Sequence, residues 1–490
     1  MAVDASGFAS SHLSEDLRAD EVPAKKGNKC LGCLKDNYFT LATLAGVCVG
    51  FAIAFGIRTT KPSAVALTWI SMPGEIYLRL LQMTILPLIA SNILLVIAAL
   101  EPKKNGRISI IGVSYVVLIN LLGAAIGTTC ASIIKPGSRQ LITPPPSSSG
   151  DSALTGTGLT VSDVFLDMFY NLFPDNIVGV TIYQFRTEVV NFTTLEKKTV
   201  SNKPGTNMIG VLFVSIAFGA AARASKEKGQ PFLDFFESLA DVVTKLMRAF
   251  LQLTPVGVCF MVASSVASRT DIQSDFVQLG LFIATVLTGL AIHFILIVLV
   301  LLAASGKNPF RLLKYSVQPY LISFATTSPA VAIGEIYDGL DRYGVSPLIS
   351  RFTTPLCSAM KGDGPAIFIT SSVLFVAQQA KYNLDLGQVL LVLFLTFASS
   401  LAVPNIPSAS MVLVVTVLSS VGVPTEGAGL LFAIEWLLDR CRSGSGGLSI
   451  MYIAATTQAI YDRTKKDTRE AELEDSAPES VKSDKENLPV

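Results

Sequence analysis

The amino-acid sequence predicts an all-α polytopic membrane protein, and three features carry this prediction. Of the 490 residues, 50% are hydrophobic and only 15% are charged, whereas about a quarter of an ordinary soluble domain is charged. The mean hydropathy is +0.53. Apolar runs of about 20 residues, the length that crosses a bilayer core, recur along the chain. A chain of this composition has too few polar groups to cover a water-exposed surface.

The charge and residue counts argue against several other classes of protein. The 38 Lys and Arg nearly balance the 37 Asp and Glu, and a formal net charge of +1 leaves no basic excess for binding nucleic acid. Two histidines are too few for a His-rich metal site, and seven cysteines in so long a chain make no disulfide scaffold. No nucleophile–base pair accompanies the charges of the apolar segments. We therefore expect no enzymatic activity, no cofactor and no metal centre.

Seven apolar segments are candidate membrane spans. They are 39–57, 83–100, 108–134, 207–222, 246–267, 276–304 and the shorter 368–380. The run at 411–438 is also apolar, but it contains Gly422, Pro424 and Glu426, so it is not one uninterrupted span.

Basic residues predict the orientation of these spans. Lys and Arg occur before the first span, between the second and third, between the fourth and fifth and after the sixth, all on one side of an alternating topology. The positive-inside rule makes that side cytoplasmic in a plasma-membrane protein, so segment 1–37 and the charged, disordered tail 463–490 are expected in the cytoplasm. The Pro/Ser/Gly-rich loop 135–204 is then extracellular, where Asn191 begins an N-glycosylation sequon.

The C-terminal part of the chain differs from the rest because Pro, Gly and Ser interrupt its apolar runs. The interruptions fall at 323–329, 361–365, 403–410 and 443–447. Broken helices at membrane depth are tolerated where they are buried in protein or line a cavity, and paired interruptions point to a transporter's binding site. We therefore expect substrate chemistry after residue 310.

Two stretches in this C-terminal part of the chain carry charges. Glu435, Asp439 and Arg442 fall on one face of a helix, four and three residues apart. An aspartate can accept an amino group and an arginine can clasp a carboxylate, which suits a zwitterion with a second carboxylate; equally, Asp439 and Arg442 can simply pair with each other. Lys361 and Asp363 flank Gly362 in a stretch that suits a turn better than a binding site.

Several motifs resemble one transporter family. They are Met72-Pro73-Gly74-Glu75, the run 81–89, the stretches 205–220 and 235–255, and 419–442, which ends in Ala-Ile-Glu-Trp-Leu-Leu-Asp-Arg-Cys-Arg. Over residues 38–462 the chain resembles the excitatory amino acid transporters and neutral amino acid exchangers, the dicarboxylate/amino acid:cation symporters. Secondary transporters commonly bind substrate near the bilayer midplane between broken helices, which agrees with the interrupted runs after residue 310.

The resemblance implies an elevator-type fold of eight transmembrane helices plus two re-entrant helical hairpins, assembled as a homotrimer. Scaffold helices would lie mainly in 38–265 and the transport-domain core mainly in 276–462, with hairpins near 308–346 and 386–424. A broken seventh helix would pass through 361–365, and the eighth would occupy 426–461.

The resemblance also implies roles for particular residues. Asp439 would hold the substrate's amino group, Arg442 its side-chain carboxylate, and Ser443 would supply a neighbouring hydroxyl. The hairpin tips would contribute backbone groups, at Ser323, Phe324 and Ala325 in the first and at Val403, Pro404 and Asn405 in the second. Because neutral-selective relatives lack the arginine, an acidic amino acid, L-glutamate or L-aspartate, is the expected partner.

The positions that bind coupling ions in the family have changed. Family cation ligands fall at Ile119, Asn120, Ala359, Gly446 and Ile450, and the proton-carrying glutamate falls at Ile369. Lys361 stands where the family has an asparagine, and among the side-chain ligands only Asp363 is clearly retained. We hypothesise that the Lys361 ammonium replaces sodium and pairs with Asp363; the alternative is that Lys361 extends to solvent and sodium binds backbone carbonyls.

These observations predict a secondary transporter-like membrane protein that binds glutamate or aspartate, with sodium and proton coupling altered or absent. Without a driving ion it would equilibrate or exchange its substrate. Two alternatives on the same fold are a non-transporting glutamate sensor and a substrate-gated anion channel. Glutamate and aspartate differ by one methylene, so the sequence leaves the choice between them open.

Overall fold

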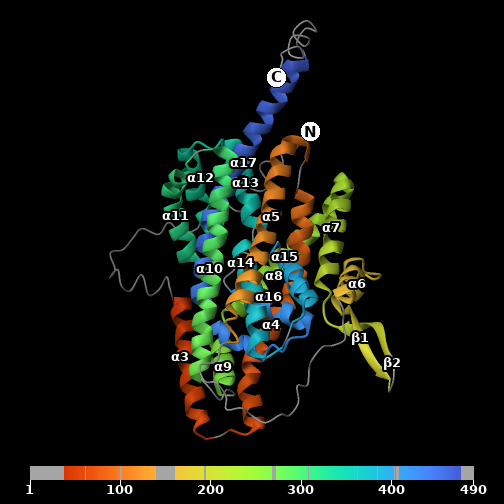
Figure 1. Ribbon diagram of the computed structural model, residues 1–490, viewed down its shortest axis with the longest axis vertical. Coiled ribbons are helices and arrows are strands. Elements are labelled where there is room, and N and C mark those ends of the chain that lie inside the picture. Colours follow the sequence, from red (N-terminus) through yellow and green to blue (C-terminus); the bar gives the residue numbers. More distant parts are fainter. Residues whose placement is uncertain are drawn as a thin grey trace, which may run out of the picture.

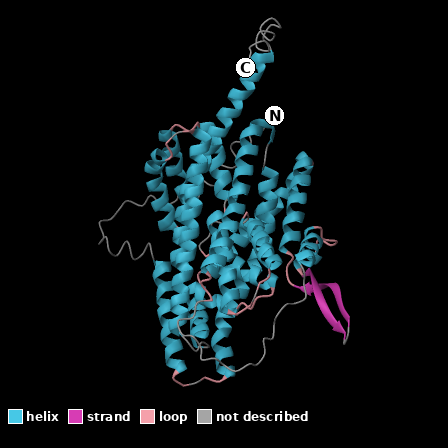
Figure 2. Ribbon diagram, viewed as in Figure 1, coloured by secondary structure: helices cyan, strands magenta, loops and turns pink. Residues whose placement is uncertain are grey.

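Long helices lying roughly along the molecule's longest axis make up most of the protein (Figures 1 and 2). The computed structural model describes residues 38–60, 62–99, 102–138, 161–192, 195–267, 272–306, 308–360, 362–382, 384–401, 403 and 408–475. Within these ranges the single sheet is a two-stranded hairpin at the edge of the bundle (Figure 2).

The first three described helices are long and apolar: α3 (Tyr38–Arg58), α4 (Ala64–Ala99) and α5 (Pro102–Ile134). Helix α4 begins well before the predicted start at residue 83 and continues through Pro73 and Pro87. The prediction was wrong at this boundary because prolines inside a membrane helix are tolerated when neighbouring helices and local adjustments satisfy the freed backbone groups.

The segment predicted as a long loop contains regular structure. Helix α6 (Val161–Leu172) and the 3₁₀ turn η1 (Gly179–Thr181) precede strands β1 (Tyr183–Phe192) and β2 (Leu195–Pro204), which pair antiparallel. The Asn171 side chain joins α6 to β1, since its Nδ2 donates to the Phe185 carbonyl at 2.8 Å and its Oδ1 accepts from the Phe185 N–H at 2.9 Å. Asn191 lies near the end of β1, opposite Glu196.

Helix α7 (Met208–Ala224) is capped by Asn207, and the turn η2 (Lys226–Gly229) leads into α8 (Gln230–Leu251) and α9 (Thr254–Ala267). The predicted single span 246–267 is wrong, because α8 and α9 meet at a bend of 56°. Pro255 stands at the start of α9, where a residue without an N–H can begin a helix but cannot continue the preceding one.

The C-terminal part consists of interrupted helices around α10 (Ile272–Ser305). Helices α11 (Phe310–Thr326) and α12 (Ile333–Tyr343), joined by η3 (Pro329–Ala332), form one helical hairpin, and α15 (Leu386–Ser400) and α16 (Ala409–Val421) form another. Between the hairpins lie α13 (Pro347–Met360) and α14 (Asp363–Gln379), and after them come η4 (Glu426–Leu431) and α17 (Phe432–Asp475).

Helix α14 lies at the centre of the protein. From Asp363 to Ala377 every residue except Pro365 is buried, and α14 packs against α5, α10, α15, α16 and α17. Its apolar side chains belong to the larger of two hydrophobic clusters, while the second cluster joins α5, α10 and the middle of α17. A helix buried on all sides needs partners for any polar group it carries, and Asp363 is such a group.

The prediction that the tail is disordered from residue 463 onward is wrong for its first part. Helix α17 continues to Asp475, while residues 476–490 lie outside the described ranges.

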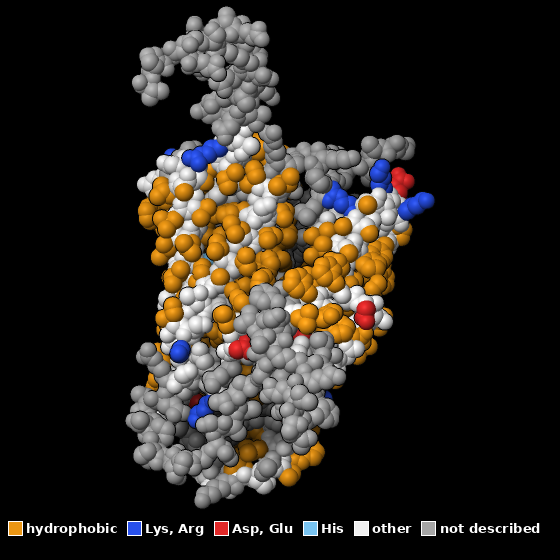
Figure 3. Space-filling view, turned by 45° about the vertical axis from the view of Figure 1, so that its right-hand side comes forward, with side chains coloured by type: hydrophobic (Ala, Val, Ile, Leu, Met, Phe, Trp, Pro, Cys, Tyr) orange, Lys and Arg blue, Asp and Glu red, His pale blue; other side chains and the backbone are white. Residues whose placement is uncertain are grey.

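The described helices confirm an all-α polytopic membrane protein. Among the described residues, four segments are long and apolar enough to cross a bilayer: Leu41–Arg58, Val65–Leu95, Ile110–Ile134 and Gln273–Ser305. The bent pair of α8 and α9 would add a fifth if it forms one broken span. Apolar side chains cover much of the face in Figure 3, whereas most of the Lys and Arg visible there lie near the end from which α17 projects. The remaining helices are too short, broken or charged to qualify by length and composition.

Candidate substrate-binding site

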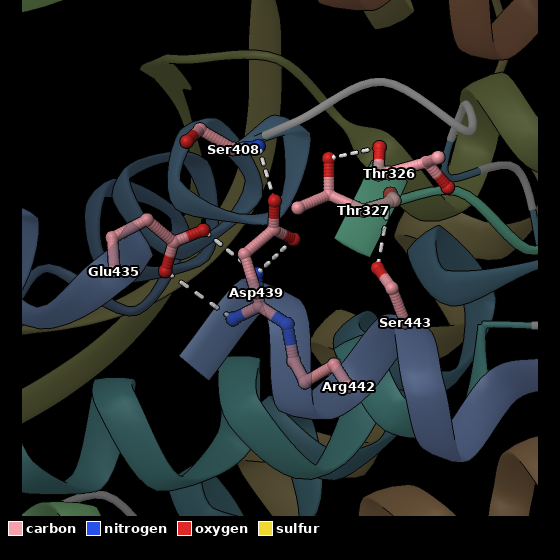
Figure 4. Close-up of polar contacts among 7 residues, drawn as sticks. All are labelled: Thr326, Thr327, Ser408, Glu435, Asp439, Arg442 and Ser443. Atoms are coloured by element: carbon pink, nitrogen blue, oxygen red, sulfur yellow. Dashed lines mark hydrogen bonds and ion pairs between the residues drawn. The ribbon is translucent and has the colours of Figure 1, made fainter. Parts of the chain in front are cut away.

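Helix α17 brings Glu435, Asp439 and Arg442 together inside the protein, as their helical spacing predicts. Their exposed fractions are 2%, 8% and 2%. Arg442 Nη2 lies 2.7 Å from Glu435 Oε1 and 2.8 Å from Asp439 Oδ1, and Nη1 lies 3.3 Å from Glu435 Oε2 (Figure 4). Of the two interpretations left open by the sequence, direct pairing of Asp439 with Arg442 is the one present in the structure.

Arg442 is also fixed by an aromatic ring. The guanidinium carbon lies 4.0 Å from the centroid of the Phe368 ring on α14, a cation–π geometry. The ring covers one face of the guanidinium while the carboxylates of Glu435 and Asp439 occupy its edges. The two carboxylates compensate the positive charge of Arg442. Charged groups of the kind that bind an amino acid are therefore already in place here.

The second hairpin reaches this cluster through Ser408. Its backbone N–H donates to Asp439 Oδ2 at 3.2 Å (Figure 4). Ser408 has φ of 60° and immediately precedes α16, so the chain turns through a left-handed residue that points its N–H toward α17. Asp439 therefore joins α17 to the second hairpin.

The first hairpin reaches the next turn of α17. Ser443 Oγ donates to the Thr327 carbonyl at 3.0 Å, and Thr327, with φ of 55°, ends α11 in a left-handed conformation (Figure 4). Arg440 Nη1 lies 2.9 Å from the Ala325 carbonyl and 3.4 Å from that of Phe324. The turns of both hairpins thus meet α17 between Asp439 and Ser443.

The remaining hairpin residues predicted to contact substrate occupy different places. Ser323 is fully buried in α11 and packs against Gly447 of α17, and the carbonyls of Phe324 and Ala325 accept from Arg440. Val403 donates its N–H to the Ser400 carbonyl at 3.5 Å. Pro404, Asn405 and Lys361 lie outside the described residues, so the proposed pairing of Lys361 with Asp363 stays a prediction.

Asp363 has two partners that sequence reasoning did not assign to it. His293 Nε2 lies 3.3 Å from Asp363 Oδ2, and Ser449 Oγ donates to the same oxygen at 3.1 Å. His293 comes from α10 and Ser449 from α17, and Asp363 begins α14. His293 is 1% exposed, so this contact lies inside the protein.

Four of the positions where the resemblance implies cation ligands carry either an apolar side chain or an amide already hydrogen-bonded to backbone. Ile119, Ile369 and Ile450 are buried among apolar side chains. The Asn120 amide is engaged with backbone, donating to the Met360 carbonyl at 3.0 Å and accepting from the Gly362 N–H at 2.8 Å. Among the described residues there is no group of three or more His, Cys, Asp or Glu that could hold a metal ion. The side chains of Ile119, Ile369 and Ile450 supply no oxygen that could bind a sodium ion.

Sequence reasoning missed Thr327, Ser408 and Arg440 as residues of this site. Each lies one to three residues from a position that was named, so a slightly wider window around each named position would have included them. Contacts such as that of His293 with Asp363 had no signal in the sequence, because the two residues belong to different helices.

Together, the apolar helices, the two helical hairpins and the buried charged cluster where the hairpins meet define a polytopic membrane protein of the secondary-transporter class. The chain belongs to the Sodium:dicarboxylate symporter family, whose family model matches residues 39–460. The family comprises secondary transporters and not enzymes, so the chain is not an enzyme.

Named relatives cover most of the chain. It is 31% identical to Excitatory amino acid transporter 3 of Homo sapiens over 453 residues, covering 86% of this chain and 85% of the relative. It is 31% identical to Neutral amino acid transporter B(0) of Oryctolagus cuniculus, covering 90% and 83%, and 30% identical to Excitatory amino acid transporter 1 of Ambystoma tigrinum, covering 84% and 81%. These findings confirm the resemblance drawn from the sequence motifs.

Proposed function

We propose that this protein binds and transports an acidic amino acid, L-glutamate or L-aspartate. The observation that carries the proposal is the position of Arg442, a buried guanidinium beside Asp439 at the point where both hairpin turns meet α17. The names of the relatives do not decide the substrate, since they include transporters of excitatory and of neutral amino acids. A fixed arginine is the group that favours a substrate with a second carboxylate.

Asp439 and the hairpins supply the other contacts of this proposed site. Asp439 is the carboxylate for the substrate's amino group, and Ser443 stands one residue after Arg442 with its hydroxyl directed toward the first hairpin. The backbone turns at Thr327 and Ser408 cover the site from both sides. Movement of a hairpin turn would open a path to the substrate and break a hydrogen bond with α17.

We further propose that coupling to sodium and protons is altered or absent. Ile119, Ile369 and Ile450 offer no ligand, and Asp363 already has His293 and Ser449 as partners. Both groups contact Oδ2 of Asp363, so this oxygen is already engaged by the chain itself. This supports substrate binding that does not need sodium to organise the site.

The assembly and topology belong to the same proposal: a homotrimer in the plasma membrane, with both termini cytoplasmic, Asn191 glycosylated, and a scaffold distinct from a mobile transport core. The junctions of α7 with α8, of α10 with α11 and of α12 with α13 lie at the same end of the molecule as the end of α17 (Figure 1). These include the basic junctions that the charge rule assigns to the cytoplasm.

The test combines binding and flux. Binding of labelled glutamate to the purified protein is measured in sodium and with sodium replaced by choline, and uptake is measured in sealed proteoliposomes. We expect binding and uptake in both media, and an Asp439→Asn variant that loses both. Strong sodium dependence would contradict the altered coupling; binding without flux would favour the sensor, and a substrate-evoked chloride current the channel.

A further inference from the structure

Glu435 takes no part in the substrate contacts proposed above, yet it is the principal partner of Arg442. The Glu435 side chain is 3% exposed, and its two carboxylate oxygens lie 2.7 and 3.3 Å from Nη2 and Nη1 of Arg442. Two roughly parallel N–H···O contacts are the bidentate geometry by which an arginine clasps a carboxylate. Glu435 therefore occupies the edge of Arg442 that would otherwise bind a substrate's side-chain carboxylate.

A third carboxylate cannot simply be added to this cluster. Asp439 already contacts Nη2 at 2.8 Å, and the Phe368 ring covers a face of the guanidinium. Three carboxylates around one guanidinium would leave two negative charges uncompensated in a buried site, where their repulsion is poorly screened. An acidic substrate must therefore compete with one of the two resident carboxylates for Arg442.

The hydrogen bonds identify which of the two carboxylates an acidic substrate would displace from Arg442. Asp439 is held from two sides, by Arg442 and by the Ser408 N–H at 3.2 Å. Among the described residues, the hydrogen bonds of Glu435 go to Arg442 alone. The Glu435 carboxylate also lies at the end of a flexible side chain with three rotatable bonds. Its release from Arg442 therefore disturbs neither hairpin.

We propose that Glu435 is a specificity-determining residue that acts as an internal competitor for the substrate's side-chain carboxylate. When a neutral amino acid is bound, Glu435 stays in place and compensates Arg442. When an acidic amino acid binds, its carboxylate displaces Glu435 from Arg442, which weakens acidic relative to neutral substrates. This inference rests on the proposed amino acid site and deepens it.

The test compares two ligands in the wild type and in one variant. Equilibrium dissociation constants for L-glutamate and L-alanine are measured with the full-length protein in detergent, for the wild type and for Glu435→Gln, which keeps the size of the side chain but removes its charge. In Glu435→Gln we expect the ratio of the alanine to the glutamate dissociation constant to rise about tenfold or more. The charge-assisted hydrogen bonds from Arg442 to Glu435 then no longer compete with those to the substrate's carboxylate. Asp341→Asn, at an exposed ion pair with Arg351, is the matched control and should leave the preference unchanged.

The outcomes separate the inference from the proposed function. If the folded wild type binds neither amino acid, the proposed function fails and the inference falls with it. If the wild type binds glutamate but Glu435→Gln weakens both ligands in proportion, Glu435 is merely structural and the inference alone is overturned. Glu435→Asp provides a second variant should Glu435→Gln not fold: it keeps the charge but shortens the reach by one methylene, and the preference should rise by a smaller factor.

Discussion

His293 Nε2 lies 3.3 Å from Asp363 Oδ2, and both side chains are almost completely buried. Ser449 Oγ donates to the same carboxylate oxygen, so α10, α14 and α17 are joined at one residue. A carboxylate in the interior of a membrane protein is tolerated when it is paired and hydrogen-bonded. The contact therefore fixes the beginning of α14 and, through it, the position of Phe368 under Arg442.

Replacing His293 by Leu should destabilise the protein, because Asp363 then loses a buried partner. Leaving a buried polar group without its partner costs about 1–3 kcal/mol, and more for a charged group. Thermal unfolding of the purified protein in detergent measures the effect as a lower midpoint temperature. In the double variant His293→Leu/Asp363→Asn the loss should be smaller than the sum of the two single losses, because the buried charge is gone. Additive losses would show that the two side chains do not interact.

Arg442→Gln should lower the thermal stability of the folded protein as well as its substrate affinity. The substitution leaves the Glu435 and Asp439 carboxylates buried together without a cation. Adding Glu435→Gln to this variant should restore a large part of the lost unfolding midpoint temperature. Only the Asp439 carboxylate then remains, and it keeps its hydrogen bond from the Ser408 N–H. A double variant no more stable than Arg442→Gln would contradict the charge balance described here.

Gly123→Ala should displace the beginning of α14. A Cβ at Gly123 would lie 2.7 Å from the carbonyl oxygen of Asp363 and 3.2 Å from its Cα, and backbone atoms cannot move aside as a side-chain end can. We expect a loss of about 1–3 kcal/mol, as for other overpacked interiors, seen as a lower unfolding midpoint. Gly280→Ala on α10 is the control: its Cβ would have nothing within 4 Å, so stability should be unchanged or slightly raised.

The effect of a substitution at Ser408 on stability and glutamate affinity should depend on whether the new residue can adopt the left-handed backbone conformation, and not on the size of its side chain. With φ of 60°, this position suits glycine and strongly disfavours a β-branched residue. Ser408→Gly keeps the N–H that Asp439 accepts, so its thermal stability and glutamate affinity should match or exceed the wild type. Ser408→Val should lower both. Equal behaviour of the two variants would argue against a left-handed turn at this residue.

Much of the fold follows from properties that are local in the sequence. Hydropathy located α3, α5, α7 and α10 to within a few residues, apart from the charged first turns of α5, because an apolar run in a bilayer is most stable as a helix. Helical periodicity placed Glu435 and Arg442 on one face. The predicted start of α4 and the predicted single span across α8 and α9 were wrong, because the effect of a proline on a helix depends on the neighbouring helices. Helix α4 continues through Pro73 and Pro87, whereas the chain bends between α8 and α9, next to Pro255.

The sequence by itself determined that this is a helical membrane protein with a charged cluster on one helix, because hydropathy and helical spacing depend on residues close together in the chain. Only the tertiary structure decided which distant groups meet that cluster: Ser408 at Asp439, Thr327 at Ser443 and Phe368 at Arg442. It also paired His293 with Asp363. Such contacts depend on how helices pack and where their backbones turn, which no local pattern specifies.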